Sequence, residues 1–200
     1  MPVLGITGGI ATGKTLFTGC LTALHPGLQV FDSDARARGL TESDATILDA
    51  IRTEFGAGVF DTKGALNRAA LREMVFAEPM KRKALEAILH PAIRHAWLDM
   101  AEANREQPGD PWLAVDIPLL FETGAETHFD KIIVIACSQA TQRRRLMEKR
   151  NLTVQLAESM IASQIPLATK IDRGDFAVWN DGLPEALQIQ ARLLSLHLFS

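Results

Sequence analysis

A glycine-rich loop at residues 8–15 constrains the fold of this chain more than any other feature. The loop reads Gly-Gly-Ile-Ala-Thr-Gly-Lys-Thr and follows directly on an apolar run at residues 3–7. Glycines let such a loop curl until its backbone N–H groups point at phosphate oxygens, and a following helix adds its positive N-terminal end. Apolar residues at helical spacing predict that helix: Leu16, Phe17, Cys20, Leu21 and Leu24. The sequence therefore predicts a strand, a phosphate-binding loop and a helix, with a nucleoside triphosphate as ligand.

Two side chains of this loop are expected to act directly on the ligand. Lys14 reaches the β- and γ-phosphates, and the hydroxyl of Thr15 holds a magnesium ion. The nucleotide-binding residues expected in the loop and the first helical turn are Gly8, Gly9, Ile10, Ala11, Thr12, Gly13, Lys14, Thr15 and Leu16.

Composition and charge limit the class of protein. With 47% hydrophobic content, 200 residues suffice for one substantial core, with room for a lid or an insert. The net charge of −3 argues against nucleic acid or an anionic membrane as a partner. No apolar run approaches the roughly 20 residues that span a bilayer, and the N-terminus enters a strand without a signal region. Cys20 and Cys137 stand far apart, which favours reduced, buried thiols and a cytoplasmic location.

Strand and helix patterns alternate along the chain. Strands are predicted at residues 3–7, 28–31, 112–116 and 131–137, with a weaker one at 176–179. Helices are predicted at residues 42–55, after an N-cap at Asn67, at 80–104 with Pro91 bending or dividing the helix, and at 141–149, 153–164 and 184–198. The alternation is typical of an α/β fold with a parallel sheet.

The stretch from about residue 35 to 107 contains predicted helices and no convincing strand. This pattern predicts a helical insert beside the sheet, ended by a turn cluster at residues 107–111.

Carboxylates follow two of the predicted strands. Asp116 ends the strand at 112–116, where a magnesium-supporting carboxylate is needed beside a phosphate loop, and Glu122 is a weaker candidate for the same neighbourhood. Asp32 and Asp34 follow the strand at 28–31, and either could orient an attacking hydroxyl and accept its proton. The spacing does not choose between these two, and both could instead cap a helix that starts near Ala35.

The densest positive patch covers residues 142–150. Arginines such as Arg145 could close over a triphosphate and stabilise charge on the transferring phosphoryl group, although a solvated basic helix is an alternative. His90 and His95 are five residues apart and do not form the i,i+4 pair of a zinc site, so structural or substrate-contacting roles are favoured.

Residues 169–172 read Thr-Lys-Ile-Asp and match a guanine-reading motif of GTPases. The residues before them look helical, however, and Asp116 is followed by Ile-Pro-Leu instead of a D-x-x-G pattern. These features disfavour a GTPase switch.

Taken in order over nearly the whole chain, the motifs resemble those of the dephospho-coenzyme A kinase family. The phosphate loop is similar to the opening signature of that family, and residues 32–38 resemble its D-x-D-x-x-x-R segment. The more specific similarities lie in Leu-Glu at residues 85–86 with Leu-His-Pro at 89–91, and in Asp-Ile-Pro-Leu-Leu-Phe-Glu at 116–122. Further matching positions are Leu66, Arg68, Leu71, Val75, Phe76, Ile93, Gln142, Arg145, Gln164, Asp175, Asn180 and Gly182.

This resemblance implies a P-loop kinase fold, a three-layer sandwich with a five-stranded parallel sheet, a helical substrate-binding insert and a helical lid. The implied single domain has its core at about 1–34, 108–138 and 174–200, the insert at 35–107 and the lid at 139–173. The implied reaction moves the γ-phosphoryl group of ATP, with Mg²⁺, to the ribose 3′-hydroxyl of dephospho-coenzyme A. Alternatives are a nucleoside or nucleoside monophosphate kinase and a nucleotide-dependent ATPase or GTPase switch, and no oligomeric state is implied.

The resemblance also implies roles for single residues. Asp34 becomes the preferred base over Asp32, and Lys14 and Arg145 complete the catalytic set. The acceptor would meet Asp34, Arg38, Arg68, His90, Pro91 and Asp116. Thr15 and Asp116 would support the metal, and Asn180 and Gly182 would lie by the adenine.

Three positions depart from the family pattern. Ala11 and Asn151 stand where glycine is usual, and asparagine tolerates the left-handed conformation. Lys149 stands where a lid arginine is common and lacks the guanidinium fork, so either Lys149 or its neighbour Arg150 could serve in the lid.

Overall fold

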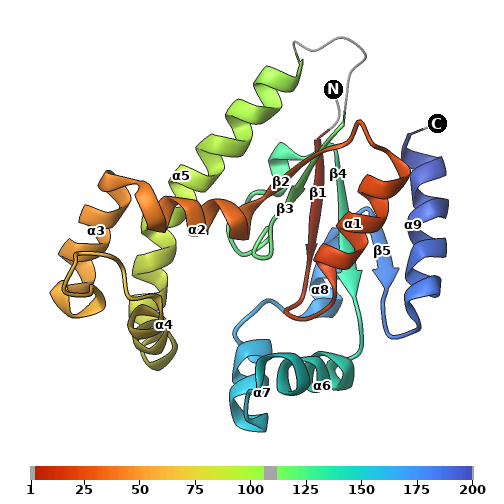
Figure 1. Ribbon diagram of the computed structural model, residues 1–200. Helices are drawn as coiled ribbons and strands as arrows, with labels where there is room; N and C mark the ends of the chain where they lie inside the picture. Colours follow the sequence, from red (N-terminus) through yellow and green to blue (C-terminus); the bar gives the residue numbers. More distant parts are fainter. Residues whose placement is uncertain (1–2, 106–111, 200) are drawn as a thin grey trace. The chain divides into compact units, whose positions relative to one another are not determined.

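The computed structural model describes residues 3–105 and 112–199 (Figure 1). The strands are β1 (Val3–Gly8), β2 (Gln29–Asp32), β3 (Leu113–Asp116), β4 (Lys131–Ala136) and β5 (Phe176–Trp179). The helices are α1 (Lys14–Leu24), α2 (Ser33–Ser43), α3 (Ala45–Phe55), α4 (Arg68–Ala77), α5 (Pro79–Arg105), α6 (Gln139–Arg150), α7 (Val154–Ala162), α8 (Leu167–Arg173) and α9 (Pro184–Leu198), with short 3₁₀ turns at Ala57–Val59 and Glu126–His128. The predicted turn cluster at residues 107–111 lies outside the described residues.

The five strands form one sheet in the order β2-β3-β1-β4-β5. β1 lies at the centre and pairs in parallel with β3, where Ile6 is opposite Asp116, and with β4, where Gly8 is opposite Ile135. β4 pairs in parallel with β5 in turn. The α/β fold with a five-stranded parallel sheet is therefore confirmed, and all five predicted strands exist to within one or two residues at their ends.

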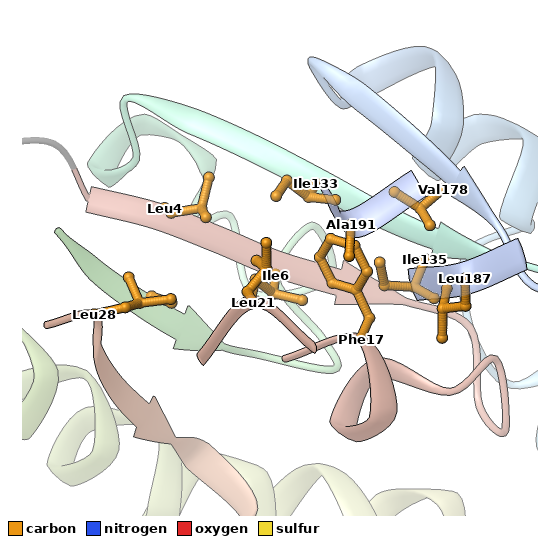
Figure 2. Packing of buried hydrophobic residues seen from close by; sticks show 11 residues of the cluster. Leu4, Ile6, Phe17, Leu21, Leu28, Ile133, Ile135, Val178, Leu187 and Ala191 are labelled. Carbon is orange, nitrogen blue, oxygen red and sulfur yellow. The ribbon is translucent and has the colours of Figure 1, made fainter. Parts of the chain in front are cut away.

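Helices cover both faces of this sheet, as the double-sided apolar character of β4 predicts. On one face, Phe17 and Leu21 of α1 and Leu187 and Ala191 of α9 pack against alternate strand residues (Figure 2). The strand residues of this cluster are Leu4, Ile6, Ala114, Ile133, Ile135 and Val178. On the other face α8 packs against β4, and the side chains of Leu120 and Phe129 lie against Gly5. The phosphate loop therefore starts at the end of β1, the strand at the buried centre of a three-layer structure.

The chain forms two compact units. The first, here called the sheet unit, contains Met1–Phe31 and Ala103–Ser200, and the second, the helical unit, contains Asp32–Glu102. The helical unit has its own apolar cluster, made by Leu40, Ile47, Ile51, Phe55, Val59 and Leu71.

For the helix predicted at residues 42–55, the predicted start is wrong. Asp44 ends α2, because its N–H donates to the carbonyl of Leu40, and its carboxylate accepts from the N–H of Ile47 at 3.1 Å to cap α3. Asn67 caps α4 as predicted, accepting from the N–H of Ala70 at 3.1 Å. Pro91 lies inside α5 without dividing it.

Within the described ranges, every helix is too short or too polar to cross a membrane.

Candidate active site

The glycines of the phosphate loop stand where neighbouring groups come very close to the backbone. A Cβ on Gly8 would lie 2.2 Å from the carbonyl oxygen of Ile135, and one on Gly9 would lie 2.5 Å from the amide nitrogen of Gln142. Gly13 has φ 100°, in a region that favours glycine, and a Cβ there would lie 2.2 Å from the side-chain amide of Asn180. Ala11 also has a positive φ, 59°, so the position where the family usually has glycine does adopt the left-handed conformation.

The loop is held through its carbonyl oxygens, four of them by side chains from outside the loop and that of Gly9 by the loop's own Thr12. Five successive carbonyls, those of Gly8, Gly9, Ile10, Ala11 and Thr12, each accept a side-chain hydrogen bond. The donors are Lys170 to Gly8, Thr12 to Gly9, Gln142 to Ile10, and Arg145 to both Ala11 and Thr12, with Asn180 also donating to Thr12. Because the carbonyl and N–H of a trans peptide point in opposite directions, this arrangement turns the N–H groups of Ala11 and Gly13 toward the other side of the loop. The loop is thus built as an anion cradle.

Two glutamines hold one residue of the loop, Ile10, through its two backbone polar groups. Gln142 of α6 donates to the carbonyl of Ile10 at 2.8 Å, and the N–H of Ile10 donates to the side chain of Gln164 at 2.8 Å. Sequence patterns singled out both glutamines only through the family resemblance. Their partners lie 132 and 154 positions away, which explains why spacing along the chain did not reveal these contacts.

The helix after the loop completes the anion site. Gly13 is the N-cap of α1, and the first turn carries Lys14, Thr15 and Leu16 with no acidic side chain to cancel the positive helix end. Thr15 and Leu16 are exposed, so both can meet a ligand.

Lys14 and Asp116 meet beside the loop. The Lys14 ammonium lies 3.9 Å from the Asp116 carboxylate, and both side chains are largely buried. The Thr15 hydroxyl and the Asp116 carboxylate supply oxygen donors, the type that Mg²⁺ prefers. In the described parts of the chain no cluster of three or more His, Cys, Asp or Glu side chains could hold a metal alone. The donor set therefore fits a magnesium ion that is also bound by nucleotide phosphates and water.

Lys170 is a buried cation that the sequence patterns did not reveal as part of this region. Its side chain is 0% exposed, and its ammonium lies 2.8 Å from Glu122 and donates to the carbonyls of Pro118 and Gly8. Burial lowers the pKa of Lys170 below its ordinary value, although the hydrogen bond and the charge of Glu122 oppose this shift. Residues 169–172, which resemble a guanine-reading motif, lie on α8. Glu122 is the counter-ion of Lys170 and is tied to Ile165 N at 3.1 Å.

Arg145, the arginine expected in the lid, is already engaged by backbone carbonyls. Arg145 of α6 donates from Nη1 to Ala11 and Thr12 at 3.1 Å and from Nη2 to the carbonyl of Asn180 at 2.8 Å. Lys149 and Arg150 are exposed at the end of α6. Asn151 follows with φ 52°, as expected for an asparagine in place of glycine.

The segment after β5 is fixed to the sheet. Asn180 is buried, and its side chain donates to Thr12 O at 2.7 Å. Asp181 accepts from the N–H and hydroxyl of Ser138 at 3.0 Å; burial would raise the pKa of this carboxyl, but hydrogen bonds from Thr141, Ser138 and Trp179 lower it. Gly182 is exposed next to them.

The two cysteines are free thiols, as the sequence predicts. Cys137 is buried at the end of β4, and burial raises its pKa to about 11, so its thiol is neutral near pH 7. Cys20, on α1, is half-buried.

Asp32 and Asp34 differ in the helical unit. Asp32 is the N-cap of α2, with its carboxylate accepting from the N–H of Ala35 at 2.9 Å. Asp34 lies in the first helical turn and is exposed. The capping alternative therefore holds for Asp32.

The remaining acceptor candidates lie on α2, α4 and α5. Arg68 donates from Nη2 to the carbonyl of Arg38 at 2.7 Å and also contacts Thr41 and Glu42. His90, which precedes Pro91 in α5, has its pKa lowered by burial, with Glu86 opposing and Arg94 adding to the shift. His95 is exposed and lies 3.4 Å from Asp99.

Comparison with known proteins agrees with this architecture. A family model described as dephospho-CoA kinase matches residues 2–185. A dephospho-CoA kinase of Anaeromyxobacter dehalogenans is 43% identical over 98% of this chain and 92% of its own length. A solved dephospho-CoA kinase structure from Campylobacter jejuni superposes with a TM-score of 0.71 at 25% identity, over 98% of this chain and 96% of that one. The shikimate kinase of Acinetobacter baumannii shares the fold at 16% identity and TM-score 0.54, covering 100% of this chain and 94% of that one. The chain belongs to the dephospho-CoA kinase family.

Proposed function

We propose how this chain carries out the reaction of its family, the ATP-dependent phosphorylation of dephospho-coenzyme A, and which residues take part. In this reaction the bond from the γ-phosphorus to the β,γ-bridging oxygen of ATP breaks, and a bond to the ribose 3′-oxygen forms. The products are coenzyme A and ADP, and the hydroxyl proton is released. The observation that carries the proposal is the phosphate loop, whose five successive carbonyls each accept a side-chain hydrogen bond, beside the Lys14–Asp116 pair at 3.9 Å.

The ATP-binding role falls to the loop. Its inward N–H groups and Lys14 bind the β- and γ-phosphates, and the positive end of α1 adds to their attraction. Thr15 and Asp116 hold Mg²⁺, which when bound neutralises charge on the phosphates. Asn180 and Gly182 border the adenine, and the buried Asn180 amide does so while supporting Thr12.

The base role falls to Asp34. Both carboxylates are exposed, but Asp32 is occupied as the N-cap of α2, which supports the choice of Asp34. Its carboxylate orients the 3′-hydroxyl and accepts the proton as the phosphoryl group transfers.

The resemblance assigns Arg145 to the transferring phosphoryl group, and we propose that it acts there by holding the loop in place through the carbonyls of Ala11 and Thr12. Arg38, Arg68, His90 and Pro91 contact the acceptor, with the neutral imidazole of His90 acting as a hydrogen-bonding group.

Two alternatives are less well supported. A nucleoside or nucleoside monophosphate kinase would share the loop but not the His-Pro segment together with residues 116–122. A GTPase switch would need Lys170 at a nucleotide base, but that ammonium is buried and paired with Glu122. We further infer that the acceptor is a small molecule and that the protein acts in the cytoplasm, consistent with its free thiols.

A coupled ADP-release assay tests the reaction. The purified chain is given ATP and Mg²⁺ with dephospho-coenzyme A, adenosine monophosphate or buffer alone. We expect rapid ADP release with dephospho-coenzyme A, together with a product phosphorylated at the 3′ position by mass spectrometry and NMR. Equal turnover in buffer alone would overturn the kinase function, and preference for adenosine monophosphate would overturn the acceptor.

A further inference from the structure

Lys170 has a complete set of partners inside the sheet unit. A lysine ammonium has three donors, and three acceptors surround this one: Glu122 at 2.8 Å, the carbonyl of Pro118 at 3.2 Å and the carbonyl of Gly8 at 3.4 Å. The side chain is 0% exposed, so every one of these contacts is made away from bulk water. A buried charge is tolerated only where its partners are this well placed.

These three acceptors belong to different parts of the phosphate site. Gly8 ends β1 and opens the phosphate loop, and Pro118 follows Asp116 by two residues. The carboxylate of Glu122 also accepts from the N–H of Ile165, directly after the Gln164 side chain that accepts from Ile10. One ammonium therefore joins the start of the loop, the exit of the Asp116 strand and the segment between α7 and α8.

A purely stabilising role does not account for this choice of residue. Well-packed apolar pairs of similar volume stabilise a core as well as a buried ion pair does, or better. An apolar side chain cannot direct carbonyl groups, however. Lys170 fixes the direction of the Gly8 carbonyl, and the planar trans peptide then fixes the N–H of Gly9 and the course of the loop toward Lys14.

We propose that Lys170, with Glu122, is a positioning residue for phosphoryl transfer. It holds the entry of the phosphate loop and the backbone after Asp116 at a fixed separation, and so keeps the Lys14 ammonium and the Asp116 carboxylate in register. Lys170 acts through these groups and touches neither ATP nor the acceptor. The proposal rests on the proposed function for its kinetic readout.

The experiment compares Lys170→Met with the double variant Lys170→Met/Glu122→Leu and with Lys170→Arg. The single variant leaves the largely buried Glu122 carboxylate without its counter-ion, so it loses both stability and activity, whereas the double variant removes both charges and regains stability. We expect the double variant to melt within about 2–4 °C of wild type. We also expect its kcat to stay lowered by about 10- to 100-fold, because displacement of catalytic groups by roughly 1 Å has effects of that size.

Further readouts separate positioning from packing. Lys170→Arg keeps the charge and the hydrogen-bond donors, so we expect it to retain most of kcat. The KM for dephospho-coenzyme A should be unchanged in every variant. Lys131→Met is the matched control, because it removes a lysine that pairs with Asp175 at 3.1 Å and is partly exposed. This control leaves kcat at the wild-type value.

A double variant that regains kcat together with its melting temperature would overturn the proposal, as would an unchanged kcat in Lys170→Met. If the single variant does not fold, the double variant and Lys170→Arg still give the comparison. Equilibrium binding of ATP is measured in parallel and is expected to weaken several-fold in the double variant. Because this measurement needs no acceptor, it decides on Lys170 even if the wild type fails to turn over dephospho-coenzyme A.

Discussion

The two units of the molecule hold their polar residues in different ways. In the sheet unit, Thr12, Lys170 and Asn180 are buried, and each is hydrogen-bonded to the backbone of the phosphate loop. In the helical unit, Asp34 is exposed, and Arg68 shares a partly exposed ion pair with Glu42.

This difference teaches how the work is divided. A buried polar group that lacks a hydrogen-bond partner costs free energy of folding. The phosphate loop of the sheet unit is therefore held in the geometry that gives these buried groups their partners. Exposed side chains have alternative rotamers and water as a partner, so the residues proposed to meet the acceptor can adjust to a ligand. We therefore expect mutations around the phosphate loop to change ATP binding, and mutations of exposed residues in the helical unit to leave it unchanged.

The largest effect on kcat should come from an exposed residue of the helical unit. Asp34→Asn removes the proposed base and is expected to lower kcat by about 10²- to 10⁴-fold. The Kd of ATP should hardly change, because the loop is built without Asp34. Steady-state kinetics and equilibrium nucleotide binding measure the two quantities.

The control for this change is Asp32→Asn. Asparagine caps a helix as well as aspartate does, so α2 should persist and kcat should stay near the wild-type value. Loss of activity in Asp32→Asn, with Asp34→Asn active, would show that the wrong aspartate was chosen.

On the buried side, Arg145→Lys should lower kcat/KM for ATP by about 100-fold, because a lysine is a point charge and cannot bind three carbonyls with one rigid fork. Unlike Asp34→Asn, this change should also weaken ATP binding. Arg144→Lys is the matched control, since Arg144 is exposed and pairs with Glu148 on the same helix. Similar kinetics for both variants would contradict a special role for Arg145.

A smaller effect is expected from pH in the helical unit. Burial lowers the pKa of His90, so between its ordinary value of 6.5 and the lower folded value the unfolded chain binds more protons. The free energy of unfolding should therefore fall as the pH drops through this window. His90→Gln should reduce the slope of this free energy against pH, by an amount that corresponds to less than one bound proton. Melting temperatures at several pH values from 7.5 to 5 test this expectation.

A pH dependence of the melting temperature that is the same in His90→Gln as in the wild type would contradict this assignment.

The smallest effect is expected at Ala11. Its left-handed conformation costs about 1 kcal/mol for a residue with a Cβ. Ala11→Gly removes this strain, but it also makes the unfolded chain more flexible, which lowers the free energy of the unfolded state by a similar amount, about 0.4–1 kcal/mol. The free energy of unfolding, measured by denaturant titration, should therefore change by less than about 1 kcal/mol. Gly13→Ala should instead lower the free energy of unfolding, because Gly13 has φ 100° and a Cβ there would lie 2.2 Å from the Asn180 amide.

Local patterns predicted much of this architecture. The alternation of apolar strands and helices predicted the parallel sheet, and the glycine loop predicted the helix that starts at Lys14. The break at Asp44 was missed because the helical spacing of apolar residues continues across it, while the cap depends on one carboxylate turning back to Ile47.

Lys170 was missed for a different reason. Its three acceptors lie 48, 52 and 162 positions earlier in the chain, so the contacts exist only after the sheet has formed. Its immediate neighbours instead matched a motif of another protein class. The roles of Asp34, Arg38, Arg68 and His90 remain predictions from resemblance, because the contacts of these side chains in the free protein do not show which ligand they bind.

The outer bonds of the phosphate loop also bear on how the catalytic cycle ends. A cradle fixed by Lys170, Gln142, Arg145 and Asn180 keeps its shape when the γ-phosphoryl group has left. ADP then meets the same inward N–H groups at its β-phosphate as ATP did. We therefore expect departure of the spent nucleotide, more than bond breaking, to set the pace of turnover.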